Sequence, residues 1–330
     1  MTETASSYAV NAILDRMEKM TAEIPGVIAS EDVECLHRMR VASRRLRTAL
    51  SLMCGEAGII DSRPFFKLVR AVTKSLGRAR DLDVQISWLG DFAEKCARGE
   101  RPGVRRLILR LGQLREKLQP GIIELLSSFT ADRSLAETTR QLQTTRLDIE
   151  MRGASPRGVD IAQATRVLGL QMESVIQHSA SLSTPDASDA QHQMRIETKR
   201  FRYAIEIYRD LYAVVFDESG DPEGMNALDE GFYVVKKLQS LLGDIHDADV
   251  WIAQIPDLIE REKNFTARYF GTPKFFIRRI EPGYNAITAE RATFRAARYQ
   301  STSEFWRTTL RENAWGRFRS LLLTAYRSCA

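Results

Sequence analysis

The chain has 330 residues, of which 44% are hydrophobic and 28% charged, and its formal net charge is +5 at pH 7. This composition is typical of a soluble globular protein with one large domain or two ordinary ones, and it excludes a disordered chain. No apolar run reaches the roughly 18 residues that span a bilayer, and the N-terminus lacks the basic start and apolar run of a secretory signal. The four cysteines form no CxxC pair. We therefore expect a cytoplasmic protein without a disulfide framework or a zinc site.

Apolar residues recur at three- and four-residue spacing along nearly the whole chain, and this period predicts helices. In chain order we predict helices over residues 8–22, 31–54, 63–77, 82–98, 103–128 and 132–149, and then over 159–180, 188–217, 225–242, 247–263, 273–300 and 303–327. Alternating strand patterns bounded by Asn-Gly or Asp-Gly turns are absent, so the expected fold class is all-α. The Gly-, Ser- and Pro-containing segment at 151–160 is the expected joint between two halves, residues 1–155 and 156–330.

The segment "LHRMRVASRRLR" at 36–47 contains five arginines and one histidine but no acidic residue. At about 100° per residue, His37, Arg40, Arg44 and Arg47 fall within roughly 80° of one face of a helix. The opposite face is apolar and is expected to pack against other helices. Solvated helix faces usually mix charges of both signs, because like charges three or four residues apart repel each other. The segment therefore predicts a helix that is anchored by its apolar side and presents its cations to an anion.

Two segments of the first half recur in the second half in the same order. The segment "HRMRVASRRLRTAL" at 37–50 aligns without a gap on "HQMRIETKRFRYAI" at 192–205, and "SLGRARDLDV" at 75–84 aligns on "LLGDIHDADV" at 241–250. The second copy again places a histidine and three cations on one face, namely His192, Arg195, Lys199 and Arg202. In this copy Glu197 is expected to face the apolar side of the helix. Glu206 is expected to lie beyond the last of these cations. These matches predict two duplicated helical bundles with basic helices along a shared groove.

Further basic residues precede the second repeated segment in each half. Lys67, Arg70 and Lys74 do so in the first half, and Lys236 and Lys237 occupy the comparable place in the second. If these helices pack beside the basic ones, two cationic faces line one groove. The chain has 38 arginines against 10 lysines, and the arginine fork is suited to phosphate and carboxylate oxygens.

The repeated pattern Gly-x-x-(Arg/His)-Asp-x-Asp allows two interpretations. In the first, each glycine ends a helix, and the aspartates cap the next helix and accept hydrogen bonds from an arginine of the basic face. In the second, His246 and Asp247, with His192 and Asp257, form the metal site of a phosphohydrolase. Arg80 takes the place of His246 in the other copy, and an arginine does not ligate a metal. The common requirement is a cation, which favours the first interpretation.

These four segments resemble the CHAD family, the conserved histidine α-helical domain, over roughly residues 8–325. The resemblance implies two helical bundles related by an approximate two-fold axis, with a basic central groove or channel that binds inorganic polyphosphate. It also implies a non-catalytic module without a cofactor, associated with polyphosphate granules and with the enzymes that metabolise polyphosphate. The ExExK strand of a triphosphate-tunnel domain is absent from the sequence, so we expect a stand-alone binder. The family motif and the flanking helices together assign polyphosphate binding to His37, Arg40, Arg44, Arg45, Arg47, Arg70, Lys74, His192, Arg195, Lys199, Arg200, Arg202, Lys236 and Lys237.

Three functions from different classes remain open: a polyphosphate-binding module, a binder of nucleic acid or another polyanion, and a metal-dependent phosphohydrolase. The basic faces lack base-stacking aromatic residues, although Phe201 and Tyr203 lie close by, and this favours phosphate over nucleic acid. The sequence also leaves open whether arginines of the C-terminal part extend the groove, namely Arg278, Arg279, Arg291, Arg295 and Arg298.

Overall fold

The computed structural model describes residues 7–30, 32–57, 63–152 and 157–329. Within these ranges all regular structure is helical, and the expected all-α class is confirmed. The helices are α1 (Ser7–Thr21), α2 (Ile24–Ala29), α3 (Val33–Ala57), α4 (Arg63–Lys95), α5 (Arg101–Ala131), α6 (Arg133–Arg152), α7 (Arg157–Gln177), η1 (Ser179–Ser183), α8 (Ser188–Ser219), α9 (Pro222–Phe270), α10 (Lys274–Arg279), α11 (Glu281–Arg311) and α12 (Ala314–Cys329). No helix of the described part is long and apolar enough to cross a membrane.

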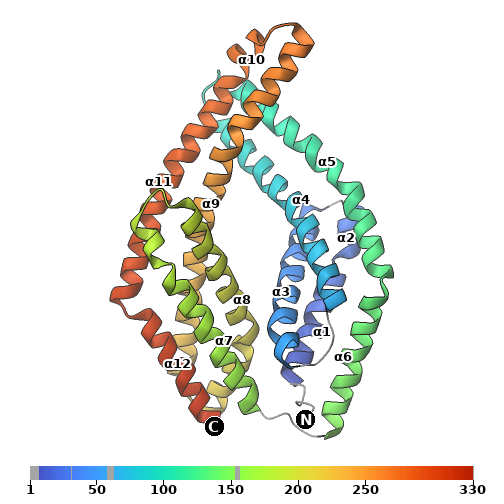
Figure 1. Ribbon diagram of the computed structural model, residues 1–330, viewed down its shortest axis with the longest axis vertical. Helices are drawn as coiled ribbons and strands as arrows, with labels where there is room; N and C mark the ends of the chain where they lie inside the picture. Colours follow the sequence, from blue (N-terminus) through green and yellow to red (C-terminus); the bar gives the residue numbers. More distant parts are fainter. Residues whose placement is uncertain (1–6, 31, 58–62, 153–156, 330) are drawn as a thin grey trace.

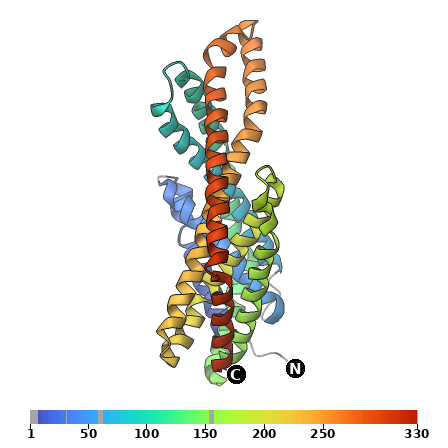
Figure 2. The same cartoon turned by 90° about the vertical axis from the view of Figure 1, so that its left-hand side faces the viewer.

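The helices form two limbs that meet at one end of an elongated molecule (Figure 1). Helices α1 to α6 make one limb and α7 to α12 the other, with α3 and α8 in contact on the inner sides. The view turned by 90° shows α9 and α11 side by side in the upper part of the molecule (Figure 2). Because α3 and α8 are in contact, the two basic segments of the sequence lie on neighbouring helices.

The apolar faces of α3 and α8 anchor both helices as expected. Met39 and Leu46 on α3, and Met194 and Phe201 on α8, have no exposed surface and belong to one hydrophobic core. Burial of such a side chain stabilises the fold by about 1.5–3 kcal/mol. This anchoring leaves the opposite, cationic face of each helix to be shared between the limbs.

The helix ends that we predicted at Gly77 and Gly243 are wrong. Helices α4 and α9 run through both positions without interruption, and the described glycines with a positive φ are Gly220 and Gly271. A glycine in the middle of a helix costs only about 1 kcal/mol relative to alanine, and apolar packing on both sides of it outweighs that cost. The aspartates of the repeated motifs therefore lie within helices and do not cap them.

Several other boundaries also differ from the prediction. The short helix α2 was not predicted, and α11 continues through the boundary expected at residues 300–303. Pro120 and Pro256 lie inside α5 and α9, although proline usually marks a helix end. The centre of the expected joint, residues 153–156, lies outside the described residues.

The end at which the limbs meet is held by a second, smaller core. Leu107 of α5, Trp251 of α9 and Tyr284 of α11 are among its buried members. Gly103 and Gly283 bring the first turns of α5 and α11 so close together that neither position has room for a Cβ atom. This contact fixes the two limbs relative to each other.

Candidate anion-binding site

A pocket of about 340 Å³ lies where α3, α4 and α8 meet. Six of its seven lining side chains are cationic, and the seventh is Thr73. The cations are Arg40, Arg44 and Arg47 from α3, Arg70 and Lys74 from α4, and Lys199 from α8. We call these six side chains the pocket cations. The structure thus brings together residues that the sequence analysis assigned to two different repeated segments.

Most of the pocket cations have no carboxylate partner. Arg40 is the exception, because its Nη2 atom lies 3.4 Å from Oδ1 of Asp81. The other five make no ion pair within 4.0 Å in the described part of the chain. In addition, the buried Nε atoms of Arg40 and Arg44 have no hydrogen-bond acceptor there. Buried donors are nearly always satisfied, and an anion in the pocket would supply acceptors for these two atoms.

Burial and mutual repulsion shift the pKa values of the cations. The pKa of Lys199 is lowered to about 7, first by burial and then by Arg44 and Arg195. Burial is also the main cause that lowers the pKa of Arg44 to about 10. The pKa values of Arg47 and Arg195 are lowered for the same reason. A bound anion would relieve this repulsion, since an opposite charge nearby favours the protonated forms.

Two residues that the sequence analysis did not assign hold the arginines in place. The hydroxyl of Tyr203 accepts a hydrogen bond from Nη2 of Arg44, and the Tyr203 ring lies 5.0 Å from Cζ of Arg44 and 4.8 Å from that of Arg202. Glu206 lies 3.0 Å from Nε of Arg45 and 3.2 Å from Nε of Arg202. Glu206 therefore ties α3 to α8, a role that its place beyond the last cation of the face did not predict.

The motif histidines lie beside the pocket and not in its lining. Nδ1 of His192 is 3.0 Å from Nδ1 of His246, and the two rings are 4.4 Å apart. Burial, followed by Arg195 and His192, lowers the pKa of His246 to about 4. The pKa of His37 is also lowered, by burial and then by Arg80. Each motif histidine thus faces the residue at the Arg/His position of its own half.

The metal-site interpretation finds little support in this geometry. No group of three or more His, Cys, Asp or Glu side chains is placed to hold a metal ion within the described ranges. His192 and His246 are close to each other, but the adjacent charges that influence His246 are those of Arg195 and Lys199. A cation would therefore meet electrostatic repulsion at this position.

The remaining predicted residues lie outside the pocket lining. Arg200 is exposed and pairs with Glu197 at 2.6 Å. Glu197 also accepts a hydrogen bond from Ser174, so it does not simply face the apolar side. Lys236 and Lys237 are exposed on α9.

The C-terminal arginines do not line the pocket either. Three of them contact side chains of α9 or α4. Arg295 donates to Asp249, Arg298 lies 3.2 Å from Asp244, and Arg291 is buried over the Trp88 ring. Arg278 and Arg279 are exposed on α10, at the end where the limbs meet (Figure 1).

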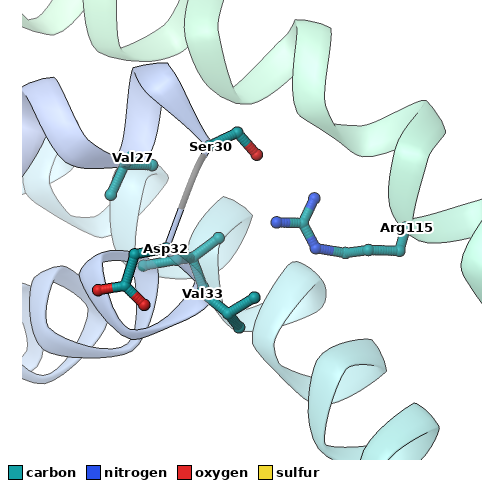
Figure 3. A pocket seen from close by; sticks show the side chains of 6 residues that line it. Val27, Ser30, Asp32, Val33 and Arg115 are labelled. Carbon is teal, nitrogen blue, oxygen red and sulfur yellow. The ribbon is translucent and has the colours of Figure 1, made fainter.

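The second aspartate of each repeated motif binds an arginine from the following long helix. Asp83 of α4 accepts a hydrogen bond of 2.9 Å from Nε of Arg115 on α5, as Asp249 does from Arg295 on α11. On its other side, the Arg115 guanidinium points towards Ser30 across a pocket of about 20 Å³ (Figure 3). That space holds about one water molecule. Arg115 is therefore a structural residue.

Asp83→Ala is expected to destabilise the protein by about 3 kcal/mol, because it leaves the largely buried Arg115 charge without its partner. The matched control is Asp81→Ala. Asp81 is 69% exposed, and its removal is expected to change the stability by less than about 0.5 kcal/mol. Urea unfolding followed by circular dichroism measures both. Equal losses of stability for the two variants would contradict the view that Asp83 stabilises the fold and Asp81 does not.

Comparison with known proteins identifies relatives of this fold. A family model described as "CHAD domain" matches residues 11–256. The crystal structure of the CHAD domain from the plant Ricinus communis is similar, with a TM-score of 0.63 and 20% sequence identity over 92% of each chain. No curated protein matches the chain.

Proposed function

Because the chain belongs to the CHAD domain family, we propose that it binds inorganic polyphosphate, without catalysis, in the pocket between α3, α4 and α8. The observation that carries the proposal is the set of six pocket cations, five of which lack a carboxylate partner in the described residues. Polyphosphate has about one negative charge per phosphate. The arginine forks are suited to its non-bridging oxygens, and the lysines act as point charges.

We further infer that the two halves, residues 1–155 and 156–330, are duplicated bundles. Two pairs of corresponding interactions and one contact between the halves support this inference. The Asp83–Arg115 pair has its counterpart in Asp249–Arg295. The electrostatic influence of Arg80 on His37 has its counterpart in the close approach of His192 and His246. In addition, Gly103 contacts Gly283 between the halves.

The pocket itself is asymmetric, because five of its cations come from the first half and only Lys199 from the second. Arg40 links the pocket to the neighbouring Arg195, and beyond Arg195 lie His192 and His246. We propose that a polyphosphate chain leaves the pocket along this path. The groove would then run between α3 and α8.

A specific contact favours phosphate chains over nucleic acid. Single-stranded nucleic acids are bound by aromatic side chains on which the bases stack. The aromatic ring at the pocket, Tyr203, instead lies under the guanidinium groups of Arg44 and Arg202. This arrangement leaves the Tyr203 ring poorly available to a base.

The proposal is tested by titrating the protein with long-chain polyphosphate, duplex DNA and heparin at several salt concentrations. We expect the tightest binding for polyphosphate, and a slope of log affinity against log salt of about −4 if the six pocket cations each displace about 0.7 counterion. If DNA or heparin binds more tightly than polyphosphate, the proposal that polyphosphate is the ligand is wrong. Release of phosphate from polyphosphate in the presence of Mg²⁺, Mn²⁺ or Zn²⁺ would contradict the non-catalytic role.

A further inference from the structure

We propose that Lys199 is a modification site: acyl phosphates held by the pocket arginines acylate its amine, and the resulting amide weakens polyanion binding. The inference rests on the proposed function in one respect, namely that the pocket holds phosphate groups. The acylation itself is a separate property of Lys199, and it is measurable without polyphosphate.

The surroundings of Lys199 differ from those of an ordinary surface lysine. Its side chain lines the pocket from α8, opposite the arginines of α3, and it makes no hydrogen bond or ion pair in the part of the chain that the structure describes. The charged and titratable groups that face it are Arg40, Arg44 and Arg47 of α3, Arg70 and Lys74 of α4, Arg195 of α8, and His246 and Asp247 of α9. Six of these eight groups are cations, so the environment disfavours the ammonium form.

This environment makes Lys199 nucleophilic near neutral pH. Only a neutral amine attacks a carbonyl carbon, and crowding by other cations activates lysine in this way. In the empty pocket the pKa of Lys199 is lowered to about 7, so about half of its side chains are neutral at pH 7. A bound phosphate partly reverses this shift, because an opposite charge favours the ammonium form. For an ordinary lysine with a pKa of about 10.4, the neutral fraction at pH 7 is only about one in 2500.

The pocket also selects the electrophile. Its volume of about 340 Å³ admits a small molecule, and Arg44 and Arg47 offer guanidinium groups to a phosphate. In the reaction, Nζ of Lys199 attacks the acyl carbon and an N–C bond forms. The bond between that carbon and the phosphate oxygen breaks, orthophosphate leaves with the electron pair, and the amine proton passes to water. The product is a neutral amide, and the pocket has lost one cation.

The test is incubation of the full chain with acetyl phosphate at pH 7, followed by peptide mass spectrometry. Lys19 serves as the internal reference, because its side chain is 68% exposed and pairs with Asp15. We expect Lys199 to be acetylated at least about tenfold faster than Lys19, and Arg44→Gln to slow the reaction at Lys199 only. Equal rates at the two lysines in the parent chain would overturn the proposal.

Addition of polyphosphate separates this inference from the proposed function. If both are right, polyphosphate protects Lys199 and leaves the rate at Lys19 unchanged. If polyphosphate binds but Lys199 reacts no faster than Lys19, the modification site is wrong and the proposed function stands. If Lys199 reacts rapidly and polyphosphate neither binds nor protects, the proposed function is wrong and the modification site stands.

The effect of acylation on binding is tested with two variants. Lys199→Gln removes the charge as acetylation does, and it is expected to weaken polyphosphate binding about fivefold or more. Lys19→Gln removes the same charge from a side chain that is 68% exposed outside the pocket, and it is expected to change the affinity by less than about twofold. Equal affinities of the Lys199→Gln variant and the parent would overturn the regulatory part of the proposal.

Discussion

Replacing Arg44 and Lys199 together by glutamate is expected to abolish polyphosphate binding while the helical content stays unchanged. Both side chains line the pocket, from α3 and α8 respectively. The double variant changes the local charge by four units and sets two carboxylates against the incoming phosphates, and like charges at an interface cost several kcal/mol. We therefore expect an affinity loss of about a thousandfold or more, measured by calorimetric titration, with circular dichroism to follow the fold.

The matched control is Arg278→Glu with Arg279→Glu. This pair makes the same change in net charge, but on exposed side chains of α10, at the end where the limbs meet (Figure 1). Screening by salt limits such charges to a range of about 8 Å under physiological conditions, so binding is expected to change little. If the control loses as much affinity as the pocket variant, net charge and not the pocket determines binding. If the pocket variant binds like the parent, the site lies elsewhere.

Helical spacing alone indicates which cations of one helix share a face. Arg40, Arg44 and Arg47 on α3 line the pocket together, as their spacing indicates. Spacing does not reveal partners on other helices, however. Tyr203 and Glu206 follow Arg202 by one and four residues, yet their contacts with Arg44 and Arg45 depend on how α8 packs against α3. The role of these two residues was therefore missed.

Glycine misled the prediction of helix ends for a related reason. A local signal of about 1 kcal/mol at Gly77 is weak beside the burial of a whole apolar face of α4. A side chain would also fit at Gly77, since an added Cβ would lie 3.6 Å from Nε of Arg40, which is an ordinary contact distance.

The affinity for polyphosphate is expected to fall as the pH rises from 6 to 8. In the empty protein the pKa of Lys199 is lowered to about 7, and a bound polyanion raises it again, because an opposite charge favours the ammonium form. Below pH 7 the lysine is already protonated, so its attraction for phosphate is fully present. Above pH 7 binding must first take up a proton, and the affinity falls by up to about tenfold per pH unit. His246, with its pKa lowered to about 4, stays neutral throughout this range.

The folding stability of the empty protein also depends on the protonation of Lys199, but it rises with pH whereas the affinity falls. Between the folded-state pKa of about 7 and the unfolded value of about 10.4, the unfolded chain binds more protons than the folded one. The stability of the empty protein therefore rises with pH in that window. Because binding is tighter at lower pH, polyphosphate is expected to raise the melting temperature more at pH 6 than at pH 8.

Lys199→Arg is the variant that tests the source of this pH dependence. An arginine stays protonated between pH 6 and 8 even when burial lowers its pKa, so the variant keeps the attraction for phosphate without taking up a proton. We expect its affinity to vary less with pH than that of the parent, at constant ionic strength and with long chains that have few terminal phosphates. If the variant's affinity depends on pH as steeply as that of the parent, another side chain near the site is the titrating group. His37, whose pKa is lowered, would then be the next residue to replace.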